Sequence, residues 1–192
     1  MKKLLHPFTY LSGEVTLALG LAGMAGMVWL ACATQQTFRG ILSFGIGEQP
    51  WWQLAAHLLA GWAIFSILLY AAARSCSPSH IRFVDIAGNQ AFAKLPNLLS
   101  LLSAVVYSPQ QLLHDAEAIK QLNFTEMQAY QPPVGMVLSG VVALVVLVWF
   151  FAWSWQGFSI AANLRGKKAV CLYIGCYLLA EVLMGIGVWL LK

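Results

Sequence analysis

Glu181 is the residue whose type and position best fit chemistry inside a membrane. It lies near the middle of an apolar stretch, residues 168–191. A charged side chain at the centre of a bilayer costs about 2.5 kcal/mol or more. Glu181 is therefore a candidate proton or cation site. The alternative is a structural role, in which a neutral acid is hydrogen-bonded to Tyr177, Ser66 or a backbone carbonyl and ties helices together.

Catalytic signatures are absent from the sequence. It contains no Walker A loop, no Gly-x-Ser-x-Gly, no His-Glu-x-x-His and no paired carboxylates. The four cysteines form no C-x-x-C and lie at no metal-ligand spacing from a histidine. We interpret them as small apolar fillers. We therefore predict that the chain is not an enzyme and uses no cofactor or metal.

The composition indicates a membrane protein. Hydrophobic residues make up 60% of the 192 positions and charged residues only 9%, whereas soluble domains carry about a quarter charged residues. No linker divides the chain, so residues 1–192 are expected to form one membrane domain whose main partner is the lipid bilayer. The net charge of +4 is spread along the chain, which argues against nucleic-acid binding. No residue pattern names a small-molecule ligand.

The apolar stretches predict an all-α transmembrane bundle of five spans. The third span is the shortest, and it is long enough only if Lys94 and Pro96 are tolerated in its first turns. Its approach, residues 88–96, is expected to be irregular and to lie at the inner face of the membrane. The predicted spans are residues 15–33, 54–73, 92–107, 134–155 and 168–191.

The distribution of basic residues orients the five spans. With the N-terminus inside and the C-terminus outside, inner segments hold eight Lys and Arg residues and outer segments hold three. This asymmetry agrees with the positive-inside rule, and it would disappear if the third span did not cross. The inner residues are Lys2, Lys3, Arg74, Arg82, Lys94, Arg165, Lys167 and Lys168, and the outer ones are Arg39, Lys120 and Lys192.

The segments between the spans carry their own signals. Residues 34–53 read as a polar connector rich in glycine. Ser108 and Pro109 fit an N-cap followed by proline at the first helical position. They precede an amphipathic pattern over residues 110–123, which predicts a helix on the outer membrane surface or over the mouth of the bundle.

Small residues repeat every fourth position in two spans, a pattern that lets helices approach closely in lipid. The two predicted stripes are Ala18, Ala22 and Gly26 in the first span and Gly135, Ser139 and Ala143 in the fourth.

Charged residues at the predicted inner face are candidate contacts for a partner or for lipid headgroups. Asp85 is expected to form a local ion pair with Arg82, or alternatively to contact an effector. The basic turn before the last span is expected to set topology and to touch anionic headgroups. The candidate contacts are Asp85, Lys94, Arg165, Lys167 and Lys168.

Two stretches resemble the Yip family, the Ypt/Rab-interacting membrane proteins. One is the third segment, with Gly88 before Pro96-Asn-Leu-Leu, and the other is the turn that ends in Lys168-Ala169 before the last span. The residues that match the family markers are Gly88, Pro96, Lys168 and Ala169. The long cytosolic region that precedes the spans in eukaryotic members is absent here. The chain therefore looks like the short prokaryotic form, and we expect it in a bacterial cytoplasmic membrane rather than a eukaryotic endomembrane.

The resemblance implies a non-catalytic membrane protein that organises membrane or partner proteins, as in trafficking or membrane homeostasis. Its partners would be other membrane proteins or further copies of the chain. The alternative is a small transporter or channel built around Glu181. That alternative requires a continuous line of polar side chains (a polar file) across the bundle. The first, second and fourth spans offer only Thr16, Ser66 and Ser139. This scarcity favours the organising function.

Overall fold

The computed structural model describes residues 7–42, 44–77, 80–121, 123 and 130–190, and the protein is mostly helical. The elements, in chain order, are η1 (Pro7–Thr9), α2 (Gly13–Thr34), β1 (Gln36–Phe38), β2 (Phe44–Ile46), α3 (Trp51–Cys76), α4 (Phe83–Ala93), α5 (Asn97–Val106), α6 (Pro109–Gln121), α8 (Val134–Ala162) and α9 (Lys167–Leu190).

Four helices, α2, α3, α8 and α9, are long and apolar enough to cross a membrane, which fits a multi-pass membrane protein. A fifth crossing is added if Phe83–Val105 and Pro109–Gln121, which are bent by 74° relative to each other, count as one broken span. The four long predicted spans are thus found as helices. Helices α2, α3 and α9 begin one to three residues earlier than predicted, and α8 begins at the predicted residue and continues seven residues beyond its predicted end.

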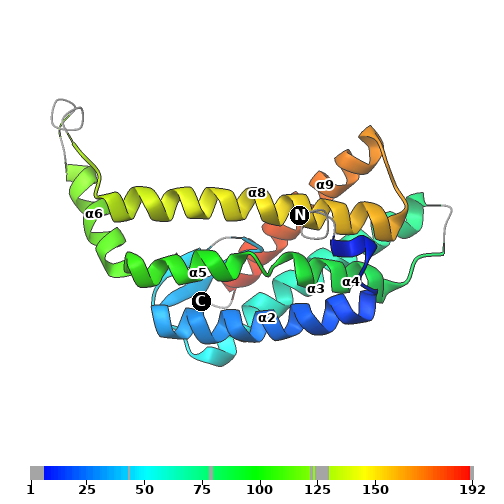
Figure 1. The fold of residues 1–192 in the computed structure, drawn as a ribbon, viewed down its shortest axis with the longest axis horizontal. Helices are drawn as coiled ribbons and strands as arrows, with labels where there is room; N and C mark the ends of the chain where they lie inside the picture. Colours follow the sequence, from blue (N-terminus) through cyan, green and yellow to red (C-terminus); the bar gives the residue numbers. More distant parts are fainter. Residues whose placement is uncertain (1–6, 43, 78–79, 122, 124–129, 191–192) are drawn as a thin grey trace.

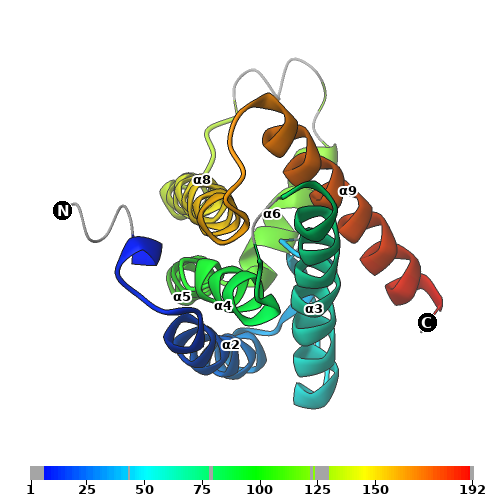
Figure 2. The ribbon, with the colours of Figure 1, turned by 90° about the vertical axis from the view of Figure 1, so that its right-hand side faces the viewer.

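Helices α2, α4, α5 and α8 lie along one axis, and α3 and α9 cross it obliquely (Figures 1 and 2). We call the end where α2, α4 and α9 begin the proximal end, and the opposite end, which carries α6, the distal end. Seen along this axis, α4 lies between α2, α3 and α8, and α9 packs on the outer side of α3 (Figure 2). Helix α4 is therefore at the centre of the bundle.

The predicted bounds of this central segment are wrong. Phe83–Ala93 is a helix, and the irregular backbone is confined to Lys94, Leu95 and Pro96, after which α5 continues. Proline explains the break, because it has no N–H and its ring clashes with the preceding turn. The break is bridged by tight turns, since the backbone N–H of Leu95 donates to Phe92 O (3.0 Å) and that of Asn97 donates to Lys94 O (2.9 Å).

Glycine allows α2 and α4 to pack at close range. A Cβ atom added at Gly88 would lie 2.2 Å from the Gly13 carbonyl oxygen and 2.7 Å from Thr16 Oγ1. The buried face of α2 follows the mixed three- and four-residue spacing of an α-helix. The predicted stripe in this span is wrong, because Ala18 and Ala22 are exposed. The buried residues are Thr16, Gly20, Met24, Met27 and Ala31.

The connector between α2 and α3 folds back into the bundle. Strands β1 and β2 pair antiparallel, with Gln36 opposite Ile46. Between them, Ile41 is buried and lies against Gly61, well inside α3. Non-helical backbone is tolerated at membrane depth only where protein or a wet cavity surrounds it. We call residues 39–42 the inserted loop.

The amphipathic helix is confirmed as α6. Its first turn is capped reciprocally: Ser108 Oγ accepts from the Gln111 N–H (3.2 Å), and the Ser108 N–H donates to Gln111 Oε1 (3.1 Å). Pro109 is the first helical residue, as expected for a residue that lacks an N–H.

Replacing Gly88 with valine is expected to loosen the contact between α2 and α4. The new side chain would overlap backbone atoms of α2, and overpacking costs about 1–3 kcal/mol. We expect a lower midpoint of thermal unfolding in detergent. Gly175→Val is the matched control, because a Cβ atom there meets nothing within 4 Å. Equal shifts for the two variants would contradict the packing described.

Candidate functional site

Lys94 lies inside the bundle, so the expectation that it sits at the inner face is wrong. Only 2% of the residue is exposed. Its neighbour Leu95 packs against Gly23, near the middle of α2, so Lys94 lies far from both ends. The ammonium group donates to the Ile41 carbonyl of the inserted loop (Nζ–O 3.0 Å) and lies 5.9 Å from the centre of the Phe150 ring.

Glu181 reaches the same loop from α9. Its Oε1 accepts hydrogen bonds from the Tyr177 hydroxyl (3.1 Å) and from the Leu42 backbone N–H (3.3 Å). The predicted bond to Tyr177 is thus present, whereas Ser66 Oγ has no partner among the described residues. Lys94 and Glu181 thus bond to consecutive residues of the inserted loop. Two opposite charges therefore flank the peptide of Ile41 and Leu42, and we call these four residues the charged site.

Polar side chains of α4 extend from the charged site toward the proximal end. Asn89 accepts from Thr16 Oγ1 (3.2 Å) and donates to the Gly157 carbonyl (3.0 Å). Gln90 donates to the Ser154 carbonyl (3.0 Å). These amides were not predicted to belong to the bundle, because both precede residue 92, where the third span was predicted to begin. Two adjacent amides just before a lysine in an otherwise apolar run were the available signal.

The charged residues and the non-helical backbone at the charged site are both features of ion-binding sites in membrane proteins. Ionisable residues inside a membrane mark ion paths, relays or substrate sites. Broken helices and non-helical backbone at mid-depth are used by transporters to bind ions and substrates. Here the break at Pro96, the inserted loop and both charges meet. Among the described residues there is no group of three or more His, Cys, Asp or Glu that could hold a metal.

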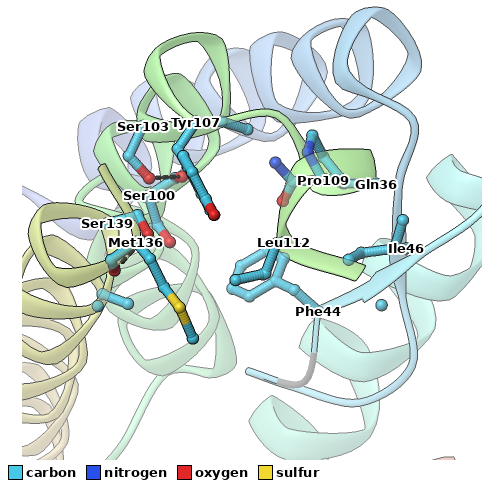
Figure 3. Close-up of a pocket in the computed structure, with 14 residues that line it drawn as sticks. Gln36, Phe44, Ile46, Ser100, Ser103, Tyr107, Pro109, Leu112, Met136 and Ser139 are labelled. Carbon is cyan, nitrogen blue, oxygen red and sulfur yellow. Dashed lines mark hydrogen bonds between the residues drawn. The ribbon is translucent and has the colours of Figure 1, made fainter. Parts of the chain in front are cut away.

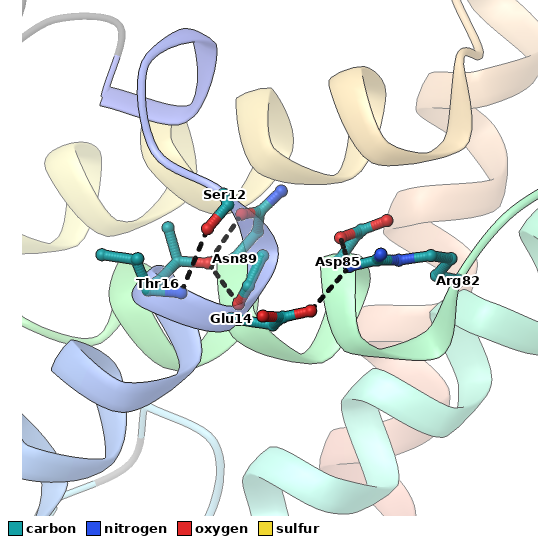
Figure 4. Close-up of polar contacts among 8 residues, drawn as sticks. Ser12, Glu14, Thr16, Arg82, Asp85 and Asn89 are labelled. Carbon is teal, nitrogen blue, oxygen red and sulfur yellow. Dashed lines mark hydrogen bonds and ion pairs between the residues drawn. The ribbon is translucent and has the colours of Figure 1, made fainter.

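A second polar cluster lies at the proximal end (Figure 4). Arg82 pairs with Asp85 (3.3 Å), as predicted, and also with Glu14 of α2 (3.4 Å). The Ser12 side chain caps α2 by accepting from the Val15 N–H (3.5 Å). These ion pairs are exposed, and exposed pairs contribute about 0–1 kcal/mol.

The basic turn also lies at the proximal end. Arg165, Lys167 and Lys168 are exposed, whereas Ala169 is buried. Gly166 has a φ of 85°, which favours glycine in this turn. Of the expected inner-face contacts, the structure therefore places Asp85 and the three basic residues at one end of the bundle, and Lys94 apart from them. Of the residues that match the family markers, Gly88 lies at the close contact between α2 and α4, and Pro96 lies at the break between α4 and α5.

Comparisons with protein-family models, curated proteins and solved structures found no match for this chain.

A double-mutant cycle tests whether Lys94 and Glu181 form one site. Lys94→Met or Glu181→Gln alone should destabilise the fold, because each leaves an opposite charge in the bundle without its partner. The double variant should lose less than the sum, with a coupling of about 0.5–3 kcal/mol in the free energy of unfolding.

The control cycle pairs Lys94→Met with Glu14→Gln, an exposed carboxylate at the proximal end. Its effects should add to within about 0.5 kcal/mol. If Lys94→Met and Glu181→Gln also add, the two residues do not form one site.

Proposed function

We propose that the chain is a small membrane transporter or channel that moves a proton or cation past the charged site. One observation carries this proposal: Lys94 and Glu181, from different helices, meet the inserted loop inside the bundle. The spans predicted from the sequence offered no continuous line of polar side chains, which favoured an organising function. The amides of α4 and the buried charge of Lys94 now support the alternative.

Each group in the charged site has a distinct part in this proposal. The Glu181 carboxylate takes up the proton or cation, and the Tyr177 hydroxyl and the Leu42 N–H hold it in place. Lys94 supplies the opposite charge. When Glu181 is neutralised, Lys94 keeps only its bond to the Ile41 carbonyl. The inserted loop is then held more strongly by Lys94 than by Glu181. The loop can therefore adopt two conformations, and the bound ion shifts the equilibrium between them.

We further propose that α4, its break and α5 cross the membrane as a fifth span, with the N-terminus inside and the C-terminus outside a bacterial cytoplasmic membrane. The burial of Lys94 removes it from the inner count, and the remaining asymmetry of seven basic residues to three still supports this orientation. A cysteine introduced at Arg165 that reacts with a membrane-impermeant reagent added outside intact cells would contradict it.

A second candidate function is the one that the Yip resemblance implies, a protein that organises membrane or partner proteins. The exposed charges at the proximal end favour it, because Arg165, Lys167 and Lys168 share that end with the pairs of Arg82. Such a surface suits anionic headgroups or an acidic partner protein. The two candidate functions use different parts of the molecule, so variants can separate them.

Flux through proteoliposomes tests the first candidate. With a pH-sensitive dye or a cation indicator inside, vesicles holding the native chain should show flux under an imposed gradient. Glu181→Gln should reduce the flux to the level of protein-free vesicles. Glutamine keeps an oxygen that can accept from Tyr177 and Leu42 while the charge is lost. Because the variant is expected to be less stable, its folded fraction after reconstitution is measured and the flux is given per folded chain.

Glu117→Gln, at an exposed position of α6, is the control and should leave the flux unchanged. Absence of flux with the native chain, or equal flux with Glu181→Gln, would exclude transport at this site. The organising function would then be the candidate that remains.

A further inference from the structure

The charged site holds a cation of its own. The Lys94 ammonium bonds to the Ile41 carbonyl (3.0 Å) and lies over the Phe150 ring, and Ile41 and Phe150 are both buried. Non-helical carbonyls beside a helix break are groups with which membrane transporters coordinate sodium ions. Here a carbonyl of this kind is taken by an ammonium group. Since the lysine ammonium is a compact unit charge, it competes with alkali-metal ions for this acceptor.

The Glu181 carboxylate is bonded to donors, which suits a proton better than a metal ion. Its Oε1 accepts from the Tyr177 hydroxyl and from the Leu42 N–H. A hard metal cation is held by several oxygen ligands at once, and an N–H cannot be one of them. A proton needs only one oxygen, with which it forms an O–H bond. With Lys94 on the Ile41 carbonyl, the described bonds of the charged site therefore favour a proton.

Two open grooves lead from the inserted loop toward the distal end. The nearer groove, of about 300 Å³, is lined by Leu42 and Ser100, and the farther one, of about 360 Å³, shares Ser100 and extends to Tyr107 at the end of α5. Figure 3 shows Ser100, Ser103 and Ser139 around the farther groove. Hydroxyl groups hydrogen-bond water, so a hydrated cation that follows them reaches the inserted loop first. A cation already bound at the loop is placed to exclude it.

We propose that Lys94 is the specificity-determining residue of the charged site: it is a tethered cation that occupies the place of a metal ion and restricts the transported species to a proton. This inference rests on the proposed function and narrows its substrate. Uptake forms an O–H bond on the Glu181 carboxylate with a proton supplied by water. Release breaks that bond and returns the proton to water on the other side. The Lys94 ammonium stays on the Ile41 carbonyl throughout.

Removal of the ammonium group should open the site to a metal ion. In Lys94→Ala, the Ile41 carbonyl loses its donor and the Glu181 carboxylate loses the opposite charge, and a buried charge left without its partner is costly. A sodium or potassium ion that keeps some of its water ligands can bind both groups. Alanine suits this test better than methionine, because its small side chain leaves space for the ion and its water.

Thermal unfolding in detergent measures ion binding without any need for transport. The full chain and its variants are compared in NaCl, KCl and choline chloride at equal ionic strength, because choline is too large to replace a sodium ion. For Lys94→Ala, the midpoint should rise in NaCl or KCl by about 3–6 °C when the ion is at tenfold its dissociation constant. The native chain should show no such rise.

Three further variants make this shift specific. Lys94→Arg keeps a positive charge and should show no rise. Lys120→Ala removes a lysine from an exposed position of α6 and should show none either. In a double variant of Lys94→Ala with Glu181→Gln, the rise should disappear, because the metal ion loses the carboxylate that attracts it.

Flux through proteoliposomes identifies the transported species. Under separately imposed gradients of pH, sodium and potassium, vesicles holding the native chain should respond to the pH gradient alone. Vesicles holding Lys94→Ala should gain sodium or potassium flux, measured per folded chain. The native chain decides the species in both experiments even if Lys94→Ala does not fold.

A native midpoint that rises in NaCl or KCl would overturn the proposal, and so would a native sodium or potassium flux equal to the proton flux. A folded Lys94→Ala variant without an ion-dependent rise would also overturn it, since Lys94 would then not occupy the place of a metal ion. Failure of the proposed function looks different, because the native chain would then carry no ion at all. The unfolding experiment would still decide whether Lys94 keeps metal ions out of the charged site.

Discussion

The bond from the Lys94 ammonium to the Ile41 carbonyl is the interaction on which the central part of the structure depends. A lysine buried inside an apolar bundle must find an acceptor, because a buried charge without a partner is costly. The inserted loop supplies the acceptor, and Glu181 supplies the charge from the other side of that loop. The loop, the helix break and α9 are thereby tied together at one point.

The rest of the bundle accommodates this point. Pro96 breaks the central helix two residues after Lys94, and Gly13 and Gly88 let α2 approach α4 until backbone atoms touch. The Trp62 indole donates to the Ala87 carbonyl (2.9 Å) and fixes α3 on the opposite side. The amides of α4 bond to α2 and α8, so its polar residues also hold the helices together. A segment this polar would not remain in lipid without these neighbours.

Local signals in the sequence predicted the local structure well. Hydropathy located the four long helices, and the Ser108–Pro109 cap located α6. The third span was misplaced because Asn89, Gln90 and Lys94 lower its hydropathy, and their partners lie on other helices. Lys94 and Ile41 are 53 residues apart, and no local pattern encodes that contact. The stripe at Ala18 and Ala22 failed because small residues mark the packing face of a helix only when a partner lies there.

Cysteine crosslinking measures the insertion of the loop most directly. In a chain whose native cysteines are replaced, Leu42→Cys and Glu181→Cys are combined and treated in native membranes with a bifunctional thiol reagent whose arm is as short as a glutamate side chain. We expect rapid intramolecular crosslinking. Gly26→Cys with Leu98→Cys is the positive control, because a Cβ atom at Gly26 lies 3.7 Å from Leu98 Cδ2, an ordinary contact distance. If the control pair links and the Leu42–Glu181 pair does not, the inserted loop does not reach α9, and the charged site does not exist as described.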